Sequence, residues 1–331
     1  MKTFVQKHPV ATFLLLNFAW TWLFWFAAMP FRGQTLLATA IVLVGGYGPA
    51  IGGILTLGLR SEQKPSISPK RTLTMLLISA LIFGVLTLRY LVGNIPNFDI
   101  LAEDLTLTMP VVVIAVIASL VGGWVFSSAV SDNSEVRTGI TSILPWRLSP
   151  LWTIFAVLFY PVMILVSWGL STLFGMSTEY PDLWEQPTLE ILPLYILTFC
   201  MTLLIQGGNE EVGWRGFMQP ELQKKFSPLV AALIVSVFWS LWHLPLFLNG
   251  VYDADLVVGM VSGGIYRIPL AIFLAWFYNR SGGNLFLTMF LHASFNRTPS
   301  LLPTPSLMLM VLCLIVAVVI VVKDKMWRKF S

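Results

Sequence analysis

The chain has 331 residues, of which 56% are hydrophobic and only 11% are charged, and its formal net charge is +4. Soluble domains carry about 25% charged residues, so this composition excludes a water-soluble globular protein and indicates a membrane protein. The basic residues sit in short loops instead of on one clustered face. This argues against a nucleic-acid partner and makes the lipid bilayer the expected one.

The chain opens with Lys2 and Lys7 ahead of an apolar run at 10–29, a start that resembles a signal peptide. The run is long enough to span a bilayer and ends in no clear small-x-small cleavage motif, so we expect it to be a retained first span. The two cysteines, Cys200 and Cys313, both lie in apolar runs. They form neither a disulfide framework nor a CxxC metal motif, and packing roles are expected.

Apolar runs of helix-spanning length recur throughout the chain. A span requires about 20 apolar residues, and continuous runs without alternation favour helices over a β-barrel. The sequence therefore predicts an all-α fold, a polytopic transmembrane helical bundle of about ten spans. The runs lie near residues 10–30, 35–59, 73–93, 109–130, 151–174, 189–207, 228–248, 258–278, 283–297 and 305–323, and 283–297 is the shortest.

Loop charge predicts the orientation of the bundle. With ten spans, the basic loops and the basic tail (323–329) all fall on one side, whereas the loops between them are acid-rich. The positive-inside rule then places both termini in the cytoplasm. We expect a prokaryotic cell (inner) membrane.

The first polar cluster is the segment NEEVGWRG at 209–216. If it is helical, Glu211 and Arg215 are i,i+4 neighbours and can pair, while Glu210 faces about 100° away. The two adjacent carboxylates can then have different roles. The arginine keeps one of them ionised, and the other is available as a base. The alternative is a cytoplasmic loop with ordinary charges.

The second and third clusters lie inside predicted spans. His243 ends the segment WSLWH, and His292 and Asn296 bound HASFN, where i,i+4 spacing puts both on one helix face about 6 Å apart. Ionisable groups within spans are costly and usually face an interior cavity. A single helix–helix hydrogen bond is the commoner use of one such residue, but that explanation weakens when several occur in one chain.

Together these segments resemble the CPBP family, the CAAX proteases and bacteriocin-processing enzymes that include the Rce1-type prenyl-protein endopeptidases and the Abi proteins. The family pattern is written EExxxR, FxxxH and HxxxN or HxxxB. Glu210, Glu211 and Arg215 match the first motif. His243 matches the second, with Trp239 where phenylalanine is usual.

His292 and Asn296 match the third motif. The flanking segments WRGFMQPEL and FWSLWHLP are also similar to sequences of the family. The resemblance covers about 185–300, which would be the catalytic core. Residues 1–184 would be N-terminal spans without an assigned function, and 301–331 the last span with its basic tail.

The resemblance implies an intramembrane endopeptidase. Glu210 would activate water with help from His243, and Glu211 and Arg215 would hold the segment in place. His292 and Asn296 would donate hydrogen bonds to the oxyanion of the tetrahedral intermediate. The substrate would be a protein or peptide, lipidated as in CAAX processing or unlipidated.

The sequence is compatible with a site that uses a metal ion and with one that does not. The family is often labelled metalloprotease, and Glu210, His243 and His292 could supply three Zn²⁺ ligands. The HExxH helix of zinc proteases is absent from the sequence, and a metal-free glutamate mechanism, also argued for relatives, is slightly favoured. The chain likewise lacks the GxSG of rhomboid proteases and a GxGD partner for Tyr252-Asp253.

Two other functions remain open. A non-catalytic membrane protein of the same fold could serve in bacteriocin immunity or as a scaffold. A transporter would more often show broken helices in matching halves, whereas here the polar clusters concentrate in the C-terminal half. Arg89 lies near a span end and can snorkel, but Arg267 lies deeper. It is expected to have a buried structural partner, with an anionic headgroup or a substrate carboxylate as the alternative.

The predicted span boundaries do not bring the clusters together. His243 lies fifteen residues past Pro228, which is roughly 22 Å along a helix, whereas Glu210 follows the predicted end of the sixth span. Either the seventh helix begins outside the bilayer, or the segment with Glu210 sits deeper than its charge suggests. We expect a mixture of the two, with a site open to the cytoplasm.

Overall fold

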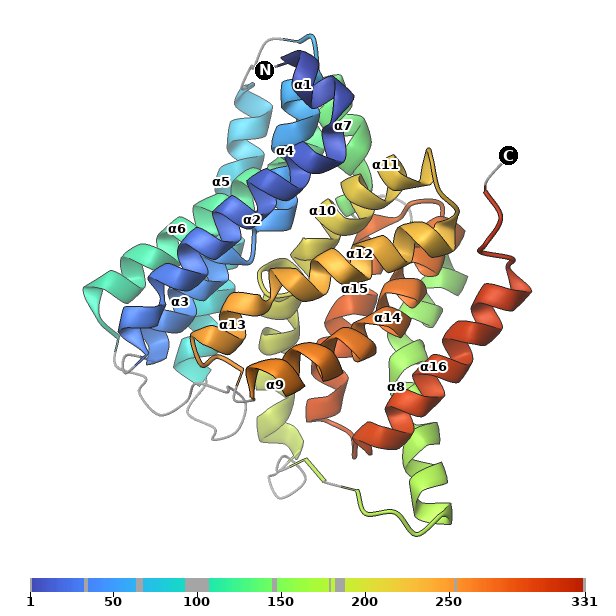
Figure 1. The fold of residues 1–331 in the computed structure, drawn as a ribbon. Coiled ribbons are helices and arrows are strands. Elements are labelled where there is room, and N and C mark those ends of the chain that lie inside the picture. Colours follow the sequence, from blue (N-terminus) through green and yellow to red (C-terminus); the bar gives the residue numbers. More distant parts are fainter. Residues whose placement is uncertain are drawn as a thin grey trace.

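The computed structural model is a bundle of helices (Figure 1), and every regular element in its described part is helical. It describes residues 2–32, 35–63, 68–92, 107–144, 148–178, 180–181, 188–252 and 255–329. Nine of the helical stretches described are long and apolar enough to cross a bilayer. The predicted polytopic helical bundle is confirmed.

The first half of the chain supplies α1–α8. They are α1 (Lys2–Lys7), α2 (Pro9–Ala27), α3 (Thr35–Gly45), α4 (Gly48–Arg60), α5 (Pro69–Val92), α6 (Met109–Ser127), α7 (Ser134–Ile140) and α8 (Pro150–Leu173). Several begin with proline in the first turn, where the missing N–H leaves no hydrogen bond unmade.

The second half supplies α9–α16. They are α9 (Thr188–Leu204), α10 (Glu211–Gly213), α11 (Gln219–Gln223), α12 (Pro228–Trp242), α13 (Leu244–Leu248), α14 (Leu256–Arg280), α15 (Leu285–Arg297) and α16 (Ser306–Lys323). Side chains of Ser227, Asp255 and Asn284 accept backbone N–H groups at the starts of α12, α14 and α15, so the caps set where these helices begin.

Helix α15 corresponds to the shortest predicted span, 283–297. Its 13 residues reach about 20 Å, less than the roughly 30 Å of bilayer hydrocarbon. It packs against α8, α9, α10 and α14, and most of its side chains are buried. Arg280 at the end of α14 pairs with Asp324 after α16 at 2.7 Å, so those two ends share one face and the chain between them must cross the bundle. A short helix can make this crossing because protein surrounds it.

The sixth span differs from its predicted bounds of 189–207. The apolar helical path runs from Leu192 to Gln223, 32 residues, and the polar segment lies within it. Helix α9 ends at Leu204, the chain bends at Gly207 with φ +132°, and 3₁₀, α and π turns follow up to α11. Predicting the end of the span at its first charges was wrong, because those charges are buried within the protein. Glu210 therefore lies well inside the bundle, which removes the conflict with the position of His243.

Helix α4 packs directly against the polar segment. A Cβ atom on Gly213 would lie 2.1 Å from the carbonyl oxygen of Pro49, so only glycine permits this approach of α10 to α4. Helix α2 packs on α4 and also touches α12 and α13. The N-terminal helices therefore form one wall of the region around the polar segment.

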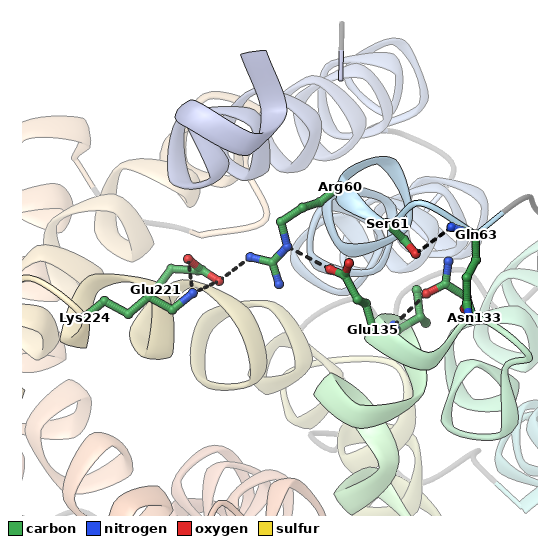
Figure 2. A network of polar contacts seen from close by, with 8 residues as sticks. Arg60, Ser61, Gln63, Asn133, Glu135, Glu221 and Lys224 are labelled. Carbon is green, nitrogen blue, oxygen red and sulfur yellow. Dashed lines mark hydrogen bonds and ion pairs between the residues drawn. The ribbon is translucent and has the colours of Figure 1, made fainter. Parts of the chain in front are cut away.

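A polar network joins three helices at one end of the bundle. Figure 2 shows the Arg60 guanidinium between Glu135 and Glu221 at N–O distances of 2.9 and 2.7 Å. Lys224 donates to the same Glu221 carboxylate at 2.7 Å. Arg60 ends α4, Glu135 belongs to α7 and Glu221 to α11, and both chain termini lie toward this end in Figure 1. The network fastens the N-terminal helices to the segment that follows the polar cluster.

Replacing Arg60 by methionine is expected to lower the free energy of unfolding by about 1–2 kcal/mol, because two half-buried charge-assisted hydrogen bonds are lost. Equilibrium unfolding in mixed micelles at low and high salt measures this loss. Lys224→Met is the control, since that side chain is 60% exposed and should cost less than about 0.5 kcal/mol. Equal losses in the two variants would show that Arg60 has no bridging role.

Candidate active site

The polar segment places an ion pair in the interior of the bundle. Arg215 Nη1 donates to Glu211 Oε1 at 3.0 Å, and both side chains are 0% exposed. The arginine also lies over the Trp239 ring, with Cζ 5.1 Å from the ring centroid. The predicted i,i+4 pair forms, and the π turn at Trp214–Met218 continues the helical path beyond it. The arginine therefore fixes the Glu211 carboxylate from one side.

Histidine 292 fixes the same carboxylate from the other side. His292 Nδ1 lies 2.7 Å from Glu211 Oε1, although 81 residues separate the two in sequence. This contact joins α15 to α10 and leaves Nε2, the nitrogen nearer Gly207, for another partner. Orientation of a histidine by a carboxylate is common at catalytic and metal sites, because it sets which ring nitrogen carries the proton.

Glutamate 210 points away from Glu211 and toward α12. Its Oε2 accepts a hydrogen bond of 2.7 Å from Trp239 Nε1, and the side chain is buried. The two neighbouring glutamates thus have different partners, an indole N–H for one and an arginine with a histidine for the other. One carboxylate oxygen of Glu210, Oε1, is left for a further donor.

Histidine 243 lies where α12 ends and α13 begins. Its Nδ1 is 2.7 Å from the carbonyl oxygen of Trp239. A carbonyl oxygen can only accept, so Nδ1 carries the proton and Nε2 of the neutral ring is an acceptor. Trp239 therefore contacts both groups, Glu210 through its indole and His243 through its backbone. This double contact was not predicted from the sequence, where Trp239 entered only as an aromatic motif residue.

Asparagine 296 and His292 share one face of α15, and this face lies against Gly207. A Cβ atom on Gly207 would be 2.5 Å from Asn296 Nδ2 and 3.5 Å from His292 Nε2. Asn296 is exposed while His292 is 3% exposed, so the pair runs from the interior to the surface of the described structure. Two nitrogen atoms thus approach the same stretch of backbone just before Glu210.

Helix α2, the first span, supplies residues that the sequence did not suggest. The Trp25 ring lies 6.1 Å from the His243 ring, and Trp242 Nε1 donates to Thr21 Oγ1 at 2.9 Å. On another side the ring of Tyr252 stacks on His243 at 6.1 Å and 17°. His243 therefore sits among aromatic rings that limit its rotation. No charge or motif in residues 10–30 signals this role, because aromatic residues are common in spans.

Zinc is the cofactor that the motifs raise, with Glu210, His243 and His292 as candidate ligands. Within the described ranges, no three His, Cys, Asp or Glu side chains converge in a way that could hold a metal ion. The Nδ1 atoms of both histidines and Oε2 of Glu210 are engaged with protein groups, which leaves Nε2 of each histidine and Oε1 of Glu210 as the only atoms of these side chains that could bind a metal. Because these side chains do not converge within the described part of the chain, the arrangement does not fit a zinc site.

These features define a polytopic helical membrane protein with a carboxylate–histidine site inside its spans. Residues 192–298 match the family model of type II CAAX prenyl endopeptidases, Rce1-like. The chain is also 30% identical over 213 residues to "CAAX prenyl protease 2" of Methanococcus maripaludis, a match that covers 60% of this chain and 76% of that relative. The chain therefore belongs to the CAAX protease and bacteriocin-processing family, as its three motifs predicted.

Proposed function

We propose that the protein is an intramembrane endopeptidase of the CAAX-processing kind, in which Glu210 activates a water molecule. The observation that carries this proposal is the different environment of the two adjacent glutamates. Glu211 is committed to Arg215 and His292, whereas Glu210 has one oxygen engaged by Trp239 and one left for a donor. Family membership supports a protease activity with a protein substrate in a lipid environment.

The water would be held by Glu210 Oε1 and His243 Nε2, since both atoms are acceptors and Trp239 holds both residues. As the water oxygen attacks the scissile carbonyl carbon, its proton passes to Glu210. The tetrahedral intermediate then collapses, the C–N bond breaks, and the proton moves from Glu210 to the leaving amine. Water is consumed, and once the new carboxylic acid also gives up its proton to the amine, one carboxylate and one ammonium group are formed, so the step balances without another reactant.

The developing oxyanion would be stabilised by His292 and Asn296. Asn296 Nδ2 is a donor in every protonation state, whereas His292 Nε2 donates only when both ring nitrogens are protonated. The Glu211 carboxylate at Nδ1 is the group that would balance this positive charge. Removing one oxyanion donor typically costs about 10²–10³-fold in rate.

The relative's name indicates the substrate to try first, a prenylated protein with a C-terminal CAAX sequence. We propose that residues 185–300 form the catalytic core. The end that carries Arg60, Glu221 and both termini would face the cytoplasm, because the positive-inside rule favours it. The apolar prenyl chain would stay in the bilayer while the peptide enters the site.

The test is hydrolysis of a prenylated CAAX peptide by the purified protein in lipid nanodiscs, followed by mass spectrometry in H₂¹⁸O. We expect cleavage with one ¹⁸O in the new carboxylate, and strong losses in Glu210→Ala, His243→Ala and His292→Ala. Cleavage that survives all three substitutions would refute the site. Absence of cleavage across a peptide panel would favour a non-catalytic protein of this fold. Loss of activity on chelation, restored by Zn²⁺, would contradict the metal-free step.

A further inference from the structure

Arg267 is a cation in the middle of a membrane helix that the mechanism above does not use. It lies near the centre of α14, and its Nη1 atom is buried without a hydrogen-bond partner. An arginine near a helix end can reach the interface, but one at the centre cannot. Charged groups at this depth are costly and are normally paired or face a pathway.

The guanidinium folds back along α14, on a stretch of that helix that packs against α12. A Cβ atom on Gly263, one helical turn earlier, would lie 2.7 Å from Arg267 Nη1, so the side chain folds back over a glycine. The next residue, Gly264, faces Ser240 of α12, whose Oγ would be 3.9 Å from a Cβ there. Ser240 lies between Trp239 and His243 in the chain, so this stretch of α14 lies against the part of α12 that holds the candidate site.

Arg267 is also electrostatically coupled to the site. Its charge acts on Glu210 and on His243, and it lies beside the phenol of Tyr252. Burial raises the pKa of Tyr252, so this phenol stays neutral at pH 7. Tyr252 can orient the guanidinium but cannot neutralise it.

Three other arginines form ion pairs and so contrast with Arg267. Arg215 pairs with Glu211, Arg280 with Asp324, and Arg60 with two glutamates. Among the residues that the structure describes, no carboxylate forms an ion pair with Arg267. Within the described ranges, the buried partner expected from the sequence is therefore the neutral phenol of Tyr252 and not a carboxylate. Arg267 therefore has an N–H group without an acceptor beside the site that we propose binds peptides.

We propose that Arg267 binds the C-terminal carboxylate of the peptide substrate and so determines specificity for cleavage near a free C-terminus. This inference rests on the proposed function. A peptide tail of aliphatic residues has one permanent charge, its terminal carboxylate, and the planar guanidinium fork matches two carboxylate oxygens. An extended chain spans about 3.3–3.6 Å per residue, so a carboxylate at Arg267 puts the scissile bond only a few residues upstream.

The test compares two peptides in two proteins. The S-farnesyl CAAX peptide is made with a free C-terminal acid and with a C-terminal amide, and kcat/KM is measured for wild type and Arg267→Gln. Wild type should prefer the acid by about 30- to 100-fold, mostly through KM, as expected for one charge-assisted pair in a dry site. In Arg267→Gln the acid-to-amide ratio should fall to within about threefold.

Two further variants separate this role from a structural one. Arg267→Lys keeps the charge but loses the fork, so an intermediate acid preference is expected. Arg280→Gln, on the same helix but paired with Asp324 at the bundle end, should keep the wild-type ratio. Equal losses on acid and amide in Arg267→Gln would overturn the proposal, because a structural defect does not distinguish the two peptides. So would a wild-type protein that makes no distinction.

A binding measurement decides the point even without hydrolysis. Fluorescence anisotropy with the two labelled peptides on Glu210→Gln protein, in the presence and absence of Arg267→Gln, reports affinity alone. Tighter binding of the acid that depends on Arg267 supports the carboxylate site whether or not the peptide is cut. Equal affinity for the acid and the amide would refute the carboxylate site. Absence of cleavage alone would count only against the proposed function.

Discussion

Glu210→Gln is expected to lower kcat by about 10³–10⁴-fold while the protein stays folded. The amide has the shape of the carboxylate, and its oxygen can still accept the Trp239 indole N–H, so packing is preserved. It cannot take a proton from water, and a positioned base typically contributes about 10²–10⁴-fold. Steady-state cleavage of the farnesyl peptide measures the loss, and thermal unfolding checks the fold.

Glu62→Gln is the matched control, because it makes the same chemical change at an exposed position. It should retain wild-type activity. If Glu210→Gln kept more than about a tenth of wild-type kcat, Glu210 would not be the base, and His243 alone would have to be reconsidered for that role. A Glu210→Gln protein that lost activity and also unfolded early would point to a structural role for the Trp239 contact.

Breaking the Arg215–Glu211 pair should have the largest effect on stability. Arg215→Met or Glu211→Leu alone leaves one uncompensated charge at 0% exposure, and such losses cost about 3–5 kcal/mol. The double variant leaves no charge behind and should regain most of that stability, since apolar replacement of a buried pair is often neutral. Unfolding in mixed micelles gives the three free energies and their coupling.

The double variant should nevertheless remain inactive. His292 would lose the Glu211 oxygen that lies 2.7 Å from its Nδ1, and with it the group that sets its orientation. The double variant would then be stable but inactive, which distinguishes a positioning role of Glu211 toward His292 from a purely structural one. Additive losses in the double variant would mean that the pair is not coupled, and an active double variant would remove Glu211 from the site.

The sequence was sufficient to predict the helical bundle and the residues of the polar clusters, because charges stand out within apolar runs. It was insufficient to predict their depth. Hydropathy ends a span at Glu210 and Glu211, whereas the fold buries both by pairing one with Arg215 and the other with Trp239. Propensity alone also did not reveal that the helical path resumes after Gly207 and continues to Gln223.

Contacts between distant segments were equally hidden. The approach of Trp25 to His243 joins the first span to the seventh, and nothing in the apolar run around Trp25 distinguishes it from a lipid-facing residue. That no described carboxylate pairs with Arg267 is a property of its surroundings, so it became visible only when the neighbouring helices were placed. In each case the sequence showed the residue, but its role depends on neighbours that lie far away along the chain.

The contact of Gly213 with the Pro49 carbonyl has an evolutionary consequence. Gly213 occupies one of the three positions that the motif EExxxR leaves unspecified, yet a side chain there would collide with backbone of the second span. Backbone cannot yield as a flexible side chain does, so any mutation at this position requires a compensating change near Pro49. We therefore expect positions 49 and 213 to covary among relatives. The motif EExxxR allows any residue at Gly213, but selection should restrict this position strongly.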